Sequence, residues 1–269
     1  MFNYHDQADG LRRIMARSSA RIISIMGVHG QPADIWLNHL AASMAGPDKR
    51  MLLIQAKQQP MEKHTLQAVA LRKSILSRAI TKHPQGYDLA SLTETGALTS
   101  PLSDDLKQQL DGIVNQLAYD YDTVMIEAQL DPRDHTFNLP LMTQHELVIQ
   151  MDRTDEAIKS SYTTIKRICQ QYGQVRLSVL VTDSSHEQGQ QYFMRLNQVS
   201  QQFLGVSLSF LGAIPGINML QKNTATAKTG FKNRHEVEPS PAAQSALAFK
   251  AIATTLEKQR LSTPSLAAA

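Results

Sequence analysis

The sequence predicts an α/β protein built on a doubly wound, mostly parallel sheet of about seven strands. Short apolar runs alternate along the chain with amphipathic segments of helical period, an order typical of parallel strands joined by crossover helices. The runs are apolar throughout, as expected of strands that helices cover on both faces. With 269 residues, 42% of them hydrophobic and 19% charged, the chain can bury a large core.

Six apolar runs are the predicted strands, and one weaker segment, residues 87–92, is a candidate seventh. The six cover residues 22–26, 51–54, 123–126, 147–151, 177–181 and 206–214. The spacing of apolar residues predicts helices over 103–119, 154–172, 187–204 and 242–261, and the segment from about residue 33 to 45 is also expected to be helical. Ser103, followed by Asp104 and Asp105, is suited to cap the first of these helices. In the last helix we expect one face to pack on the sheet, formed by Leu247, Ala248, Ala251, Ile252, Thr255 and Leu256.

Three segments make up the predicted organisation. Residues 21–261 form the α/β domain, residues 1–20 are an N-terminal segment with at most a short helix, and residues 262–269 are a flexible tail. The single cysteine, Cys169, cannot form an internal disulfide, and the first residues lack the basic start and apolar core of a signal peptide. We therefore expect a cytoplasmic protein.

Composition and patterning argue against several classes of function. The net charge is +3 and no basic stripe interleaves with aromatic residues, which argues against nucleic-acid binding. The nine histidines are scattered, without the spacing typical of metal ligands, so no metal site is expected. The last helix is rich in alanine and poor in Lys and Arg, and we expect membrane association to be absent or weak.

The segment between the first strand and the first helix occupies the position of a phosphate-binding loop. It consists of Gly27, Val28, His29, Gly30, Gln31, Pro32, Ala33 and Asp34. In a working loop, backbone N–H groups surround the phosphate oxygens, a Lys reaches the β and γ oxygens, and a Ser or Thr hydroxyl holds magnesium. Here two glycines remain, but the Lys and the hydroxyl are missing.

The opening residues carry a resemblance to a known family. DQADGLRRIM (6–15), followed at once by a strand, a loop and a helix ending in HLAASMA (39–45), resembles the MinD-like flagellar number regulators called FlhG or FleN. In that family a DQAxxLR-type segment precedes a deviant Walker loop of the form KGGVGKT. Three later stretches are also similar: LLIQAK (52–57) to LLIDAD, YDYDTVMIEA (119–128) to YDYVLIDT, and FLGVSLSFLGAIP (203–215) to FLGV followed by a strand and LGxIP. The resemblance covers nearly the whole chain and implies the P-loop NTPase fold of MinD and ParA.

Compared with the family, the loop differs wherever nucleotide chemistry is carried out. Val28 stands at the position of the signature lysine, Pro32 at a glycine, Ala33 at the phosphate lysine and Asp34 at the magnesium-binding Thr. Proline has no N–H to donate, and a carboxylate about 4 Å from a phosphate is repelled by roughly 4 kcal/mol at an effective dielectric near 20. The family's cofactors are ATP and magnesium, and these residues predict that this chain binds neither.

Four further family positions bear on nucleotide binding. Gln55 and Lys57 stand where the family has two switch aspartates, and Asp183 stands near an Asn that would face the adenine. Glu127 keeps a carboxylate at the Walker B position, and we interpret it as a surface acid at the end of a strand. Lys57 offers an alternative, because it could reach back to phosphate and replace the lost lysine.

The loop residues predict a monomeric pseudo-ATPase, and the resemblance to FlhG and FleN implies that it controls flagellar number or placement. The resemblance implies that its N-terminal segment acts on a signal-recognition-type GTPase of the FlhF kind, through Asp6, Gln7, Ala8, Leu11, Arg12 and Met15. Two alternatives remain. One is an active or weakly active ATPase of the partitioning or polar-localisation type, and the other is a MinD-like accessory protein of another secretion or surface-polymer system.

Overall fold

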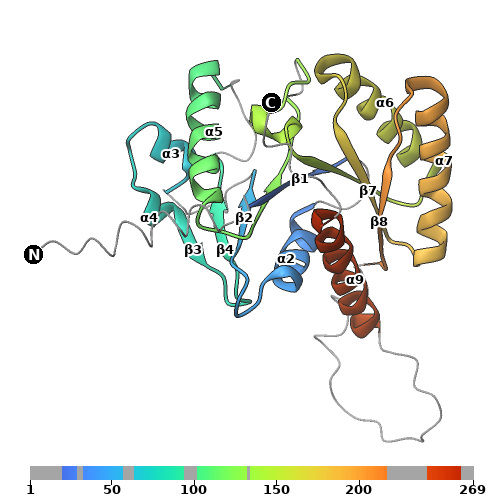
Figure 1. The fold of residues 1–269 in the computed structure, drawn as a ribbon, viewed down its shortest axis with the longest axis horizontal. Coiled ribbons are helices and arrows are strands. Elements are labelled where there is room, and N and C mark those ends of the chain that lie inside the picture. The colour runs from blue at the N-terminus through green and yellow to red at the C-terminus, as the bar shows by residue number, and fades with distance from the viewer. Residues whose placement is uncertain are drawn as a thin grey trace, which may run out of the picture. The chain divides into compact units, whose positions relative to one another are not determined.

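The computed structural model describes residues 20–28, 33–56, 64–93, 102–131, 134–216 and 241–261. Within these residues one sheet has the strand order β3-β4-β2-β5-β1-β6-β7-β8 (Figure 1). Its strands are β1 (Arg21–Gly27), β2 (Met51–Gln55), β3 (Ile80–Lys82), β4 (Asp88–Ser91), β5 (Thr123–Glu127), β6 (Glu146–Met151), β7 (Arg176–Thr182) and β8 (Ser209–Ile214). The helices are α2 (Ala33–Met44), α3 (Leu66–Ala70), α4 (Leu76–Ala79), α5 (Asp104–Ala118), the 3-10 helix η1 (Pro140–Thr143), α6 (Asp155–Tyr172), α7 (His186–Leu204) and α9 (Pro241–Leu261).

The sheet is mostly parallel, as the sequence predicts. β2 pairs in parallel with β4 and β5, and β7 pairs in parallel with β6 and β8. The edge strand β3 runs antiparallel to β4. The prediction of a doubly wound α/β fold is therefore confirmed, and β3 is an additional strand that the apolar pattern does not predict.

Contacts between residues divide the chain into two compact units. Unit 1 comprises residues 1–23, 45–126 and 130–141, and unit 2 comprises residues 24–44, 127–129 and 142–269. That residues 21–261 form one domain stays a prediction. The predicted tail, residues 262–269, and all but the last residue of the predicted N-terminal segment lie outside the described residues.

In unit 1, α3 packs against α5, and α4 contacts the edge strand β3. Helix α5 buries Leu110, Val114 and Leu117, which are spaced as one face of a helix requires. The Ser103 hydroxyl accepts a hydrogen bond from the Leu106 N–H at 3.3 Å, so the predicted cap is confirmed.

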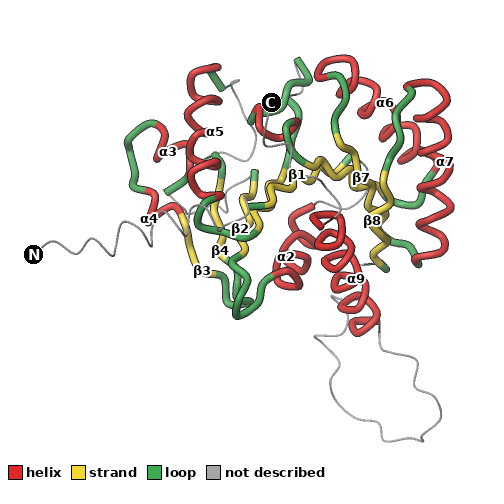
Figure 2. The backbone as a smooth tube through the Cα atoms, in the orientation of Figure 1, coloured by secondary structure: helices red, strands yellow, loops and turns green. Residues whose placement is uncertain are grey.

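In unit 2, helices lie on both faces of β6, β7 and β8. Helices α6 and α7 pack on one face, and α2 and α9 lie together on the other (Figures 1 and 2). The strands are buried almost throughout, which explains why they are apolar runs without alternation.

Helix α9 packs on α2 and β8 with a face that matches the predicted one only in part, since Ile252 and Leu256 are buried as predicted. Its buried residues are Ser245, Phe249, Ile252, Ala253 and Leu256, and the Phe249 ring stacks on His39 at 5.5 Å between centroids. Leu247 is 60% exposed and Ala251 is exposed as well, so the prediction that these two residues pack on the sheet is wrong. The prediction failed because alanines surround this helix on all sides and leave its apolar face poorly defined.

Candidate functional site at the carboxyl ends of the strands

The exit from β1 is the position of the predicted phosphate loop. β1 ends at the exposed Gly27, and the N–H of the half-buried Val28 donates to the Gln150 carbonyl of β6 at 3.0 Å. Residues 29–32 of the loop, which are His29, Gly30, Gln31 and Pro32, lie outside the described residues. α2 begins at Ala33, so the last two loop residues belong to its first turn.

A buried polar chain links the ends of β6 and β7. Gln150 and Thr182 are both fully buried, and the Gln150 Nε2 donates to the Thr182 Oγ1 at 2.9 Å. The Thr182 hydroxyl in turn donates to the Met151 carbonyl at 3.3 Å. These two bonds pair the Gln150 amide nitrogen and the Thr182 hydroxyl, which lowers the cost of burying them and ties the two strand ends together.

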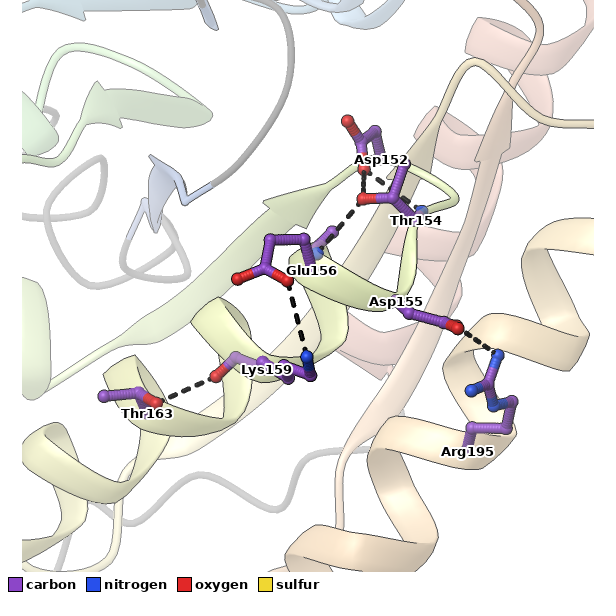
Figure 3. A network of polar contacts seen from close by, with 8 residues as sticks. Asp152, Thr154, Asp155, Glu156, Lys159, Thr163 and Arg195 are labelled. Atoms are coloured by element: carbon purple, nitrogen blue, oxygen red, sulfur yellow. Dashed lines mark hydrogen bonds and ion pairs between the residues drawn. The ribbon is translucent and has the colours of Figure 1, made fainter.

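The connection from β6 to α6 is a polar turn (Figure 3). Asp152 follows β6 directly, and its Oδ1 accepts hydrogen bonds from both the N–H and the hydroxyl of Thr154, at 3.2 and 2.6 Å. The Thr154 oxygen then accepts from the Ala157 N–H at 3.1 Å and so caps α6. Asp152 is thus engaged in holding the start of a helix.

Ion pairs extend this polar turn along α6 and across to α7 (Figure 3). The Asp155 carboxylate lies 2.7 Å from the Arg195 guanidinium of α7, and the Glu156 carboxylate lies 3.5 Å from the Lys159 ammonium. Arg153 donates to the Gln188 Oε1 at 2.9 Å. These side chains are solvent-exposed, so each pair contributes little to stability. The Asp155–Arg195 pair joins α6 to α7, whereas the Glu156–Lys159 pair lies within α6.

Asp183 follows β7 in a left-handed backbone conformation, with φ at 56°. A side chain on Gly216, beyond β8, would place its Cβ 3.2 Å from the Asp183 Oδ1, so the carboxylate lies close to a backbone without a side chain. The Ser184 N–H donates to the Ile214 carbonyl at 3.1 Å and ties the two strand ends together. Asp183 therefore lies at a strand end, as the sequence predicts.

Glu127 corrects one interpretation made from the sequence. It ends β5 and is only 7% exposed, so the expectation of a surface acid is wrong. The strand is buried through its last residue, and a carboxylate there is shielded from water. Next to it, the Ala128 N–H donates to the Ile25 carbonyl of β1 at 2.7 Å.

Of the remaining predicted site residues, the structure describes Gln55 but neither Lys57 nor the N-terminal partner-binding residues. Gln55, in unit 1, ends β2 and is 7% exposed. Lys57 lies outside the described residues, and so do the predicted partner-binding residues Asp6, Gln7, Ala8, Leu11, Arg12 and Met15.

Within unit 2 the chemistry of the strand ends is acidic. β5 ends with Glu127, β6 is followed by Asp152 and β7 by Asp183, so an acid stands at the end of each of these three strands. Among the described residues, no three His, Cys, Asp or Glu side chains gather closely enough to hold a metal ion. Sequence reasoning missed Gln150 and Thr182, although a Gln inside an apolar run was a signal for a buried polar pair.

Comparison with known proteins supports both the fold and the resemblance. No family profile matches the chain. A stretch of 137 residues is 26% identical to the antiactivator FleN of Pseudomonas aeruginosa and covers 51% of this chain and 46% of FleN, so the chain matches about half the length of this relative. None of the described helices is long and apolar enough to cross a bilayer.

Solved structures with the same fold come from the MinD and ParA proteins. The MinD cell division protein of Aquifex aeolicus superposes with a TM-score of 0.62 at 15% identity, covering 91% of this chain and 99% of MinD. A plasmid partition protein of Borrelia burgdorferi bound to AMPPNP gives a TM-score of 0.58 at 15% identity, covering 89% of this chain and 99% of that one. The fold is therefore that of the MinD and ParA P-loop proteins, and the predicted resemblance to FleN-type regulators is confirmed.

Proposed function

Starting from a MinD-like chain that resembles FleN, we propose that this protein regulates flagellar number or placement without binding or hydrolysing ATP. It acts through its N-terminal segment on a signal-recognition-type GTPase of the FlhF kind. The similarity to FleN supports the process, and the composition of the loop between β1 and α2 supports the loss of nucleotide chemistry.

The loop composition is the single observation that carries the proposal. Pro32, Ala33 and Asp34 replace an N–H donor, a cation and a magnesium ligand in a stretch of three residues. Each replacement weakens triphosphate binding by an independent mechanism: a missing hydrogen bond, a missing charge and an added repulsion. One of them alone could be compensated, whereas all three together remove the features on which phosphate binding depends.

The acids at the strand ends of unit 2 add to this argument. Glu127, Asp152 and Asp183 stand at strand ends of unit 2, and the cation that follows Asp152, Arg153, is bonded to Gln188. A triphosphate entering here would meet carboxylates where P-loop proteins offer a Lys and a helix N-terminus.

We expect titration calorimetry with ATP and magnesium to show no binding tighter than about 1 mM and no release of phosphate. FleN or MinD, titrated in the same buffer, is the positive control. The double change Ala33→Lys and Asp34→Thr is not expected to restore hydrolysis, because Pro32, Gln55 and Lys57 are unchanged. Micromolar binding of ATP by the unmodified chain would refute the proposed loss of nucleotide chemistry.

An active ATPase of the polar-localisation type is the second candidate, and the burial of Glu127 favours it. A carboxylate that is 7% exposed at the end of β5 is the kind of group that orients a magnesium ion or a water in P-loop proteins. The two candidates differ in one measurement: if Lys57 replaces the lost lysine, ATP binds and Lys57→Ala abolishes that binding.

The N-terminal segment provides the test of the partner. Leu11 and Met15 are spaced as anchors of a helix that docks into a groove, and Gln7 would supply a polar contact to the GTPase. We expect Leu11→Ala to weaken binding of the FlhF-type GTPase and Gln7→Ala to lower its stimulated turnover. Removal of residues 1–20 should abolish both effects.

Thermal unfolding separates this partner role from a purely structural one. A segment that serves only a partner contributes little to the fold, so Leu11→Ala should leave the melting temperature nearly unchanged. A melting temperature lowered by several degrees, together with GTPase turnover that never responds to the intact protein, would show that the segment covers this protein's own surface instead.

A further inference from the structure

The turn between α3 and α4 carries a basic and apolar surface that the proposed function does not use. Its residues lie on the turn, on α4 and on the edge strand β3, and we call them the turn patch: Leu71, Arg72, Lys73, Ile75, Arg78 and Lys82. All six are exposed. Leu71 is 44% exposed and Ile75 is 58% exposed, so two large aliphatic side chains lie open to solvent among the cations.

The cations of the patch have no acidic partner in the described residues. No ion pair or hydrogen bond of the described structure involves the side chains of Arg72, Lys73, Arg78 or Lys82. The sequence from 64 to 87 contains no Asp or Glu. Asp88 of β4 stands opposite Lys82 in the sheet, and its Oδ2 accepts a hydrogen bond from the Tyr121 hydroxyl at 2.7 Å. Four positive charges are therefore concentrated on twelve residues, around two exposed aliphatic side chains.

The backbone of the turn is rigid. The Arg72 N–H donates to the Val69 carbonyl at 2.9 Å and the Lys73 N–H to the Ala68 carbonyl at 2.8 Å, the two hydrogen bonds of a Schellman motif at the end of α3. The Ser74 hydroxyl lies 2.9 Å from the His64 Nδ1 and anchors the far side of the turn. The patch residues thus project from a fixed turn rather than from a loose loop.

Arg72 occupies the position in this motif that normally holds glycine. Its φ of 56° is left-handed, a conformation that costs an L-residue free energy and that glycine adopts freely. The chain keeps a guanidinium there at the expense of local strain. Strain of this kind is typical of sites where the side chain is needed for a contact.

We propose that the turn patch attaches the protein, weakly and reversibly, to an anionic lipid surface. Lys and Arg side chains pair with lipid phosphates, while Leu71 and Ile75 enter the boundary between headgroups and acyl chains just below them. A bilayer accommodates side chains that project from a turn, because it deforms around them. This site is separate from α9, whose composition is unsuited to lie on a membrane.

Two other polyanions fit the patch less well. A nucleic acid would engage the four cations but would gain nothing from two aliphatic side chains, and no exposed aromatic ring lies in the patch on which a base could stack. Protein–protein interfaces usually depend on Trp, Tyr or Arg side chains that fill a pocket on the partner, and Leu is under-represented among them. The apolar part of the turn patch consists of Leu71 and Ile75, so an acidic protein is a poorer fit.

The test uses the full chain with sedimenting vesicles of pure phosphatidylcholine and of equal parts phosphatidylcholine and phosphatidylglycerol. We expect binding to the anionic vesicles at low salt, little binding to the neutral ones, and weakening as salt is added. Lys73→Gln with Arg78→Gln should weaken binding by about 25-fold, since each cation near an anionic surface contributes about fivefold. Leu71→Ser with Ile75→Ser should weaken it by roughly tenfold.

Two controls keep the result interpretable. Lys166→Gln with Arg167→Gln removes two exposed cations from α6 and should leave vesicle binding unchanged. Arg72→Gly relieves the left-handed strain, so it should raise the melting temperature while it lowers vesicle affinity by about fivefold. A loss of binding in a variant that unfolds at a higher temperature cannot be attributed to misfolding.

Several results would overturn the proposal. One is that the protein does not bind anionic vesicles. Another is that it binds them equally well when the turn patch is substituted. Binding to a DNA duplex or to polyglutamate without binding to the vesicles would also overturn it and would assign the patch to that partner instead. ATP binding plays no part in this test, so its outcome is independent of the proposed function.

Discussion

Asp111 on α5 has an ionisation that opposes folding. Its Oδ2 accepts a hydrogen bond from the Leu141 N–H of η1 at 3.1 Å, while its Oδ1 is buried without a hydrogen-bond partner in the described structure. Burial raises the pKa of this carboxyl from 3.8 to about 6, and the Leu141 hydrogen bond offsets only part of the effect. A group with a raised pKa is bound to its proton more tightly in the folded chain than in the unfolded chain.

This raised pKa predicts a pH dependence of stability. Between about pH 4 and 6 the folded chain binds the extra proton, so the free energy of unfolding falls as the pH rises through this window and levels off above it. Asp111→Asn keeps an acceptor for Leu141 and carries no charge. We expect the variant to melt at a higher temperature than the unmodified chain at pH 7, and this difference to shrink towards pH 4.

Thermal melts followed by circular dichroism across this range provide the measurement. Asp120→Asn, an exposed acid two residues beyond the end of α5, is the matched control and should keep the pH dependence of the unmodified chain. An Asp111→Asn variant that is less stable than the unmodified chain at pH 7 would show that the charge itself is needed.

Single residues are also where reasoning from the sequence is least reliable. The sequence predicts a surface acid at Glu127 because acids usually are exposed, and only the position of β5 inside the sheet reveals that it is buried. Gln150 and Thr182 show a second kind of error. The apolar runs around them predict purely apolar strands, whereas these two polar side chains are buried there and form a hydrogen bond. Burial is decided by neighbours from distant parts of the chain, and local pattern does not encode them.

At the scale of elements, apolar runs and cap residues locate most strands and helices to within a residue or two. β8 is an exception, since it begins at Ser209 rather than at 206. Gly205 ends α7 with a φ of 67°, and the Leu208 N–H donates to the Asn197 side chain at 2.9 Å, so these residues close the helix instead of extending the strand. The apolar pattern misses β3 because three residues, two of them exposed, form no apolar run.

Two helical glycines allow the packing of elements to be tested by the same substitution. A Cβ on Gly189 of α7 would lie 2.6 Å from the Ala213 Cβ of β8, whereas a Cβ on Gly112 of α5 meets nothing within 4 Å. Gly189→Ala should therefore push α7 away from the sheet and destabilise the fold by about 1–3 kcal/mol. Gly112→Ala should stabilise it by up to about 1 kcal/mol, because alanine favours helix.

Urea unfolding of the two variants measures both effects. Each glycine serves as the control for the other, since the chemical change is identical and only the surroundings differ. A Gly189→Ala variant as stable as the unmodified chain would mean that α7 does not lie as close to β8 as described.

At the scale of the whole molecule, the parallel sheet follows from the alternation of strands and helices, but the chemistry of the site does not follow from the fold. The same fold in relatives holds AMPPNP, as in the Borrelia burgdorferi protein, so the fold permits nucleotide binding without requiring it. Whether a chain with this fold binds nucleotide depends on the loop of eight residues between β1 and α2, and half of these residues lie outside the described structure.

Self-association is a property of the whole molecule that the loop predicts. In the family that this chain resembles, the face-to-face dimer depends on nucleotide and on the signature lysine, and Val28 stands in that position here. We expect light scattering to give the mass of one chain, about 30 kDa, with and without ATP and magnesium. A doubling of mass on addition of ATP would contradict both this expectation and the proposed loss of nucleotide binding.

Because Arg72 is left-handed, a single substitution to glycine should make the fold more stable. The same position can therefore separate selection for folding from selection for function. In a library displayed and challenged only with protease, glycine should become enriched at position 72, since it removes strain and leaves both hydrogen bonds of the turn in place. In cells that depend on the protein, arginine should persist. The difference between the two enrichment ratios would measure how much the Arg72 side chain contributes to fitness beyond its effect on stability, whichever partner it binds.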